Sequence, residues 1–254
     1  MTSGANPKSA RRPSAGVPFA EPRSDRLAAL QATLGPHAAT IRTRRGQNVA
    51  LAVEGSEAAF IVHAGALTLN VTMPGTSRQV VAILSAGDVL CSSFVPRQAN
   101  GTLTPVSAGE LWRLRWSAFA KLLAKDPAIA SFYHEAINRQ VARRAIHVAA
   151  IGQFDCQQKV ATFLLELALR TGTPSPSGGG VVFDMPLSRN EIADYLGLNA
   201  DTLSRTMSRL RSSGVLNHTE RNCAMLRDFR ALAALSPAAR ALIDLHGERQ
   251  LAAS

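Results

Sequence analysis

The sequence predicts an α+β protein with three parts, in the order β domain, long helix and winged helix-turn-helix. Three observations support this prediction. Short apolar segments broken by turn residues occupy 38–114, apolar residues at helical spacing occupy 127–152, and two capped helical segments joined by a glycine occupy 187–216. The expected parts are a tail (1–26), a β domain (27–124), a long helix (125–152), a winged helix-turn-helix (153–230) and a C-terminal extension (231–254).

Composition narrows the class of protein before any motif does. The 254 residues are 46% hydrophobic and carry 28 Lys+Arg against 18 Asp+Glu, a formal net charge of +10. This excess of positive charge favours a polyanion as partner. The sequence has no apolar run of about 18 residues and no secretory signal at its start, so we expect a cytoplasmic protein that does not enter the membrane. Its three cysteines are too scattered for a disulfide framework or a metal site.

Residues 1–26 are expected to form a disordered basic tail. They contain four prolines and five basic residues but only two acidic residues, Glu21 and Asp25. Prolines at this density prevent a helix, and few large apolar side chains remain to be buried.

The β domain is indicated by apolar segments at 58–63, 66–72, 79–84 and 110–115, of which the last alternates apolar and polar residues. Turn residues separate the segments, for example Pro74-Gly75 and Gly87-Asp88. Short strands at this spacing predict a β-barrel, sandwich or roll.

The long helix is expected to begin near Pro127 and to carry one apolar face. At about 25 residues it is longer than the usual 11 or 12. A long apolar stripe that its own chain does not cover needs a second chain, so we expect a homodimer. The alternative is that the stripe packs on the β domain of its own chain. The expected interface residues are Ile129, Phe132, Ala136, Ile137, Val141, Ala145 and Val148.

The C-terminal part contains the clearest motif. Ser188 and Glu191 form a capping box at the start of a short helix, and Gly197 supplies the positive φ of a sharp turn. Asn199 then caps a second helix, whose inward residues are expected to be Leu203, Met207 and Leu210. A hairpin wing is expected over 214–227.

The second helix has the properties of a recognition helix. Asp201, Ser204 and Arg205 share the outward face near its N-terminus, the part of such a helix that enters the major groove and reads bases. Arg205 can donate two parallel hydrogen bonds to O6 and N7 of guanine. The expected phosphate contacts are Ser188, Thr202, Ser208, Arg209, Arg211 and Arg221. We therefore expect double-stranded DNA as a partner.

Two features together resemble a known family. The order of the three parts, and the phrase EIADYLGLNADTLSRTMSRLRSSGVL, are similar to the Fnr/FixK branch of the Crp/Fnr superfamily of transcription regulators. In the β domain, EGSEAAFIVHAGALTLN and RQVVAILSAGDVL occupy the expected places. The resemblance implies a cyclic-nucleotide-binding-like jelly roll, a homodimer on a two-fold symmetric TTGAT-like site, and RNA polymerase as a partner. This branch usually has Glu where the chain has Asp201, so the acidic contact is one methylene shorter.

The sequence lacks the residues with which members of this family bind an iron–sulfur cluster or a cyclic nucleotide. The first cysteine is Cys91, so the N-terminal cysteine cluster of Fnr for iron–sulfur is absent. The glutamate that holds a cyclic nucleotide is also missing after Gly87. We therefore expect no cofactor and no metal, and the effector is left unassigned.

The sequence leaves other functions open. His63 raises the alternative of a haem- or gas-sensing regulator, and Cys156 and Cys223 are candidate redox positions. A different class of protein would be a ligand-binding module whose helix-turn-helix makes protein contacts only. No catalytic motif is present, so we do not expect an enzyme.

Overall fold

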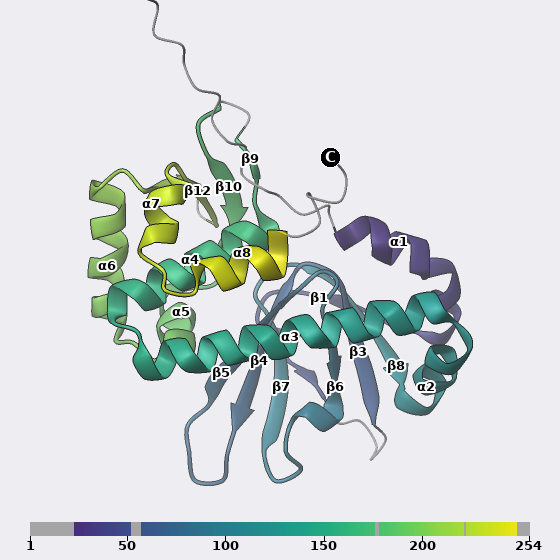
Figure 1. The fold of residues 1–254 in the computed structure, drawn as a ribbon. Coiled ribbons are helices and arrows are strands. Elements are labelled where there is room, and N and C mark those ends of the chain that lie inside the picture. Colours follow the sequence, from purple (N-terminus) through teal and green to yellow (C-terminus); the bar gives the residue numbers. More distant parts are fainter. Residues whose placement is uncertain (1–22, 52–56, 176–177, 221, 248–254) are drawn as a thin grey trace, which may run out of the picture.

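The computed structural model describes residues 23–51, 57–175, 178–220 and 222–247 (Figure 1). Most of the expected tail therefore lies outside the described residues. Its last four positions do not belong to a tail, because helix α1 begins at Arg23 and runs to Leu34. Leu27, Leu30 and Leu34 repeat at helical spacing and are buried against the N-terminal domain, which explains why the helix forms.

The N-terminal domain is a roll of two four-stranded antiparallel sheets, with strand orders β1-β8-β3-β6 and β2-β7-β4-β5. Its strands are β1 (Ala39–Thr43), β2 (Val49–Ala50), β3 (Ala58–Ala64), β4 (Ala66–Thr72), β5 (Gln79–Ser85), β6 (Val89–Cys91), β7 (Asn100–Pro105) and β8 (Gly109–Arg115). Phe60 and Leu111 from one sheet meet Leu69 and Leu103 from the other in a common core. The β-roll prediction is confirmed.

Two helices follow the roll: α2 (Trp116–Lys125) and α3 (Pro127–Gln153). The Asp126 side chain caps α3 by accepting hydrogen bonds from two backbone amides, and Pro127 occupies its first turn as expected. Figure 1 shows α3 running across the width of the molecule, in front of the roll.

The position of α3 corrects part of the expected dimer interface. Ile129, Phe132 and Ala136 are buried in a cluster with roll residues and Phe119 of α2, so they cannot face a second chain. Ile137 is half-buried on the same cluster. The alternative, packing on the chain's own β domain, holds for this half of the helix.

The C-terminal part forms one core around α4 (Cys156–Thr171). Its other elements are β9 (Thr173–Pro174), β10 (Val181–Asp184), α5 (Arg189–Leu196), α6 (Ala200–Ser212), β11 (Leu216–Glu220), β12 (Cys223–Leu226), α7 (Phe229–Ala234) and α8 (Ala239–Gly247). The strands form a sheet in the order β11-β12-β10-β9.

The described part of the expected C-terminal extension, residues 231–247, belongs to this same core. Helix α7 crosses the expected boundary at residue 230, and Leu232 and Leu242 are fully buried in the cluster that contains α4. The hydroxyls of Thr162 and Ser236 also lie 2.8 Å apart. No helix in the described ranges is both long and apolar enough to cross a membrane.

Candidate nucleic-acid interface

The helix-turn-helix forms through local contacts that the sequence predicts. Ser188 Oγ accepts a hydrogen bond from the amide of Glu191 at 3.3 Å, while Glu191 Oε2 accepts one from the amide of Ser188 at 2.6 Å. Gly197 ends α5 with φ of 59°, a left-handed conformation that favours glycine. Asn199 Oδ1 then accepts from the amide of Asp201 at 2.8 Å and caps α6.

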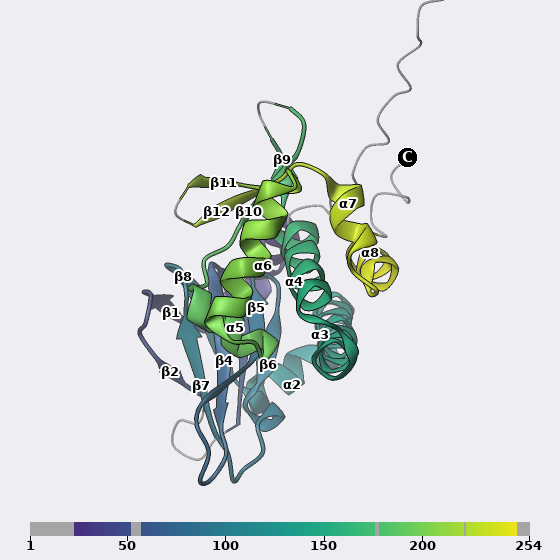
Figure 2. The same ribbon diagram turned by 90° about the vertical axis from the view of Figure 1, so that its left-hand side faces the viewer.

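Helix α6 presents two different faces. Leu203, Met207 and Leu210 are buried in the domain core, as expected. On the opposite side, Asp201 and Arg205 are exposed and Ser204 is half-buried. Figure 2 shows α6 at the surface beside the β11–β12 hairpin. The three expected base-reading residues thus lie together on an accessible helix face.

The expected phosphate-binding residues fall into three groups. Ser208 and Arg209 are exposed on α6. Arg211 is half-buried and held on its own helix, because its Nε donates to the carbonyl of Met207 and its Nη2 donates to Ser208 Oγ. Ser188 serves the capping box, and half-buried Thr202 accepts a hydrogen bond at its carbonyl from Thr206. Arg221 lies outside the described residues.

The wing is the β11–β12 hairpin, with Leu216 opposite Leu226. On β12, the Cys223 thiol donates to Asp184 Oδ1 at 3.6 Å. The other candidate redox residue, Cys156, is exposed at the first position of α4, after the capping residue Asp155. A redox role for either cysteine stays a prediction.

Contacts between the roll and the helix-turn-helix are a feature that the sequence does not predict. Arg45 Nη1 donates to the carbonyl of Pro186 at 2.8 Å, and its Nη2 lies 3.6 Å from the capping residue Glu191. At the other end of α5, Gln79 donates to the carbonyl of Asp194 at 2.6 Å. The first helix of the motif is therefore fixed to the roll at both ends.

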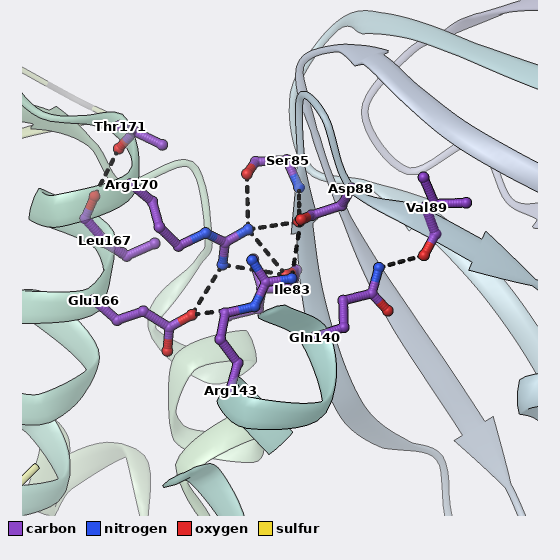
Figure 3. A network of polar contacts seen from close by, with 10 residues as sticks. All are labelled: Ile83, Ser85, Asp88, Val89, Gln140, Arg143, Glu166, Leu167, Arg170 and Thr171. Carbon is purple, nitrogen blue, oxygen red and sulfur yellow. Dashed lines mark hydrogen bonds and ion pairs between the residues drawn. The ribbon is translucent and has the colours of Figure 1, made fainter. Parts of the chain in front are cut away.

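A buried polar network joins all three parts of the chain (Figure 3). Asp88, in the turn after β5, lies 3.0 Å from Arg143 of α3 and 2.7 Å from Arg170 of α4. Glu166 pairs with Arg170 at 3.0 Å and with Arg143 at 3.9 Å. Burial alone would lower the pKa of Arg143, but the charges of Asp88 and Glu166 outweigh it and raise that pKa. Arg143 lies outside the apolar stripe of α3 in the sequence, yet the fold buries its side chain.

His63 has its partners within the roll, whereas Cys91 contacts helix α3. His63 Nδ1 lies 3.4 Å from Glu110 Oε1, and its ring stacks on Trp112 with centroids 4.5 Å apart. Cys91 is buried, with its thiol 3.8 Å from the hydroxyl of Tyr133. Burial raises the pKa of the Cys91 thiol, while the Tyr133 contact acts in the opposite direction. These contacts are ordinary packing and do not favour a haem site.

Comparisons with known proteins agree with this geometry. Residues 158–235 match the model of the Crp-like helix-turn-helix domain. The nitrogen fixation regulation protein FixK of Azorhizobium caulinodans is 29% identical over 177 residues, 70% of this chain and 71% of that protein. The transcriptional activator protein FnrL of Cereibacter sphaeroides is 28% identical over 193 residues, covering 74% and 76%.

The solved structures extend the comparison to the fold. The structure of FixK2 from Bradyrhizobium japonicum superposes with a TM-score of 0.65 at 24% identity, covering 79% of this chain and 98% of that one. A roll, a long helix and a Crp-like helix-turn-helix define a DNA-binding transcription regulator. Residues 158–235 are thus a Crp-like helix-turn-helix domain, and the chain is similar over most of its length to regulators of the Fnr/FixK branch of the Crp/Fnr family.

Proposed function

We propose that the protein is a homodimeric regulator that reads a two-fold symmetric, TTGAT-like DNA site and acts with RNA polymerase in the cytoplasm. Asp201, Ser204 and Arg205 read bases, while Ser208 and Arg209 contact phosphates. The proposal includes no catalytic activity. It also includes no iron–sulfur cluster, haem or cyclic nucleotide.

The exposed face of α6 is the observation that carries this proposal. Arg205 lies one turn after Asp201 on that face, and both side chains are open to solvent. A guanidinium at this place in a recognition helix can form the bidentate contact with guanine that discriminates best between bases. The N-terminus of α6 adds a favourable position for a phosphate, because the helix dipole favours negative charge there.

The dimer is supported by the second half of α3. Val141 and Val148 are 62% and 70% exposed, and Ala145 between them is exposed as well. Together with Asn138 and Gly152, which are also exposed, they alternate at steps of three and four residues. This is the spacing of a coiled-coil seam. Two copies of α3 packed along it would give a two-fold axis, which a palindromic DNA site requires.

Selection of bound duplexes from a random pool tests the proposal, with Arg205→Ala as the matched control variant. The wild-type chain should enrich a palindrome whose half-site centres are about one helical turn apart. The binding constant should fall steeply as salt concentration rises. A pool without an enriched motif, together with weak binding that does not depend on salt, would favour a helix-turn-helix used for protein contacts only.

A further inference from the structure

A small cavity lies where the roll, the long helix and the helix-turn-helix meet. Its volume is about 20 Å³, and its lining includes part of β5, Arg143 and Arg144 of α3, Glu166 of α4 and Tyr195 of α5. One water-sized particle needs about 10–15 Å³. The cavity therefore has room for a single water molecule or a monoatomic ion.

Two donors from the lining residues are left without an acceptor. Nη1 of Arg143 and Nη2 of Arg144 are buried and make no hydrogen bond within the described part of the chain. The Arg143 side chain is only 7% exposed, so solvent outside the protein cannot satisfy it. A buried, charged N–H group costs free energy unless an acceptor reaches it.

The charges around the cavity do not balance. The guanidinium groups are those of Arg143, Arg144 and, one contact further away, Arg170. The carboxylates that pair with them are Asp88 and Glu166, which leaves an excess of one positive charge. Arg144 carries this excess, because the two carboxylates pair with Arg143 and Arg170. Burial and then the neighbouring charge of Arg143 lower the pKa of Arg144, and Tyr195 acts in the opposite direction.

We propose that this cavity binds one monoatomic anion, chloride in solution, through Nη1 of Arg143 and Nη2 of Arg144. Glu166 also lines the cavity, but its Oε1 already lies against Arg170 and Arg143, so its charge is compensated. A bound chloride accepts both unsatisfied N–H groups and cancels the excess charge. A water molecule accepts the same hydrogen bonds but leaves the charge in place.

The site would connect the three parts of the regulator. Its lining comes from the roll, from α3 beside the exposed seam, and from α4 and α5 of the DNA-binding part. An anion held there would stabilise the position of the helix-turn-helix relative to α3. Chloride then becomes a ligand of the folded state, separate from its general screening of DNA binding.

Crystals of the full chain grown in sodium bromide give the direct test. An anomalous peak is expected within hydrogen-bond distance of Nη1 of Arg143 and Nη2 of Arg144. In solution, replacing gluconate by chloride at a constant ionic strength of about 300 mM should raise the melting temperature by about 2–4 °C. No DNA is present in either experiment, so failure of the proposed DNA specificity would not affect the result.

Arg144→Gln keeps much of the side chain but removes the excess charge, so it should abolish the difference between chloride and gluconate. Arg139→Gln is the matched control, because Arg139 lies on the same helix, pairs with Glu135 at 3.4 Å and does not line the cavity. It should retain the full difference. A bromide map without a peak at this position, or equal melting temperatures of the wild type in both salts, overturns the proposal.

Discussion

Asp88 Oδ2 accepts a hydrogen bond from Arg170 Nη2 at 2.7 Å, although the two residues are 82 positions apart in the chain. Asp88 belongs to the roll, and Arg170 lies near the end of the first helix of the DNA-binding part. The other carboxylate oxygen of Asp88 accepts from Arg143 of the long helix at 3.0 Å. One buried acid therefore joins the three parts of the regulator.

Asp88→Asn should destabilise the whole protein. The change leaves two guanidinium groups buried without their main counter-charge, which costs about 3–5 kcal/mol when one partner of a buried ion pair is removed. Urea unfolding measures the loss. Arg78→Ala is the control, because its pair with Asp194 is largely exposed and should contribute less than about 1 kcal/mol. Equal losses for the two variants would contradict the role given to Asp88.

Arg205→Ala should change which sequences are bound. Loss of a bidentate guanine contact costs about 1–3 kcal/mol, or roughly tenfold to a hundredfold per half-site, and relaxes the preference at one base pair. Arg209→Ala should weaken all sequences about equally and reduce the salt slope by about one unit. Gel-shift titrations over a panel of half-site variants separate the two effects. If Arg205→Ala weakens binding to all half-site variants equally, Arg205 contacts a phosphate and does not read a base.

The paired change Val141→Glu and Val148→Glu should yield monomers. Four carboxylates would then face one another along the proposed seam, while both side chains are already exposed in the single chain and its fold is undisturbed. Sedimentation at micromolar concentration gives the mass, and circular dichroism checks the fold. Lys121→Glu on the exposed surface of α2 adds negative charge elsewhere and should stay dimeric. A wild type that is already monomeric would refute the seam.

Stability should fall as the pH drops below about 6.5, and His147 should be one cause. Burial lowers the pKa of His147, the charge of Glu166 opposes this effect, and Lys159 adds to it. The ring also stacks on Tyr195 at 4.0 Å. Because the unfolded chain binds the proton more tightly, acid favours unfolding. In urea titrations at pH 7.5 and 5.5, His147→Phe should lose less stability than the wild type, whereas exposed His134→Phe should follow the wild type.

Thiol labelling should distinguish the cysteines of the native protein. Cys156 is exposed at the start of α4, whereas Cys91 is buried and its thiol pKa is raised by that burial. A coloured disulfide reagent at pH 8 should modify Cys156 much faster than Cys91. The fast phase should disappear in Cys156→Ser. If it persists in that variant, it arises from another cysteine.

Short-range signals made the recognition motif predictable. The capping box at Ser188, the turn at Gly197 and the cap at Asn199 each depend on residues within four positions, so a local pattern contains the whole interaction. The β strands were equally visible where they alternate with turn residues. Helix α1 is not predicted, because the basic, proline-rich composition of the segment before it continues into its first turn.

The features that the sequence does not predict depend on packing between residues far apart in the chain. The apolar stripe of α3 appeared to be one face, but its first half is buried on the roll and its second half points outward. The buried face continues through Gln140 and Arg143, whose polarity hides it from a hydrophobic pattern. Their partners, Val89 and Asp88, lie 51 and 55 positions away, and only the folded chain brings them together.

The burial of Arg170 limits how the DNA-binding part of the chain can be joined to other sensor domains. Its side chain is 2% exposed and its acid lies in the roll, whereas the matched DNA-binding domain begins at residue 158, on the same helix as Arg170. A chimera that joined this domain to an unrelated sensor would contain Arg170 but would lack its counter-charge, Asp88. The transferable module is therefore larger than the homologous one. A chimera must also receive the β5–β6 turn that contains Asp88. Otherwise Arg170 must be replaced by an apolar residue that can be buried without a counter-charge.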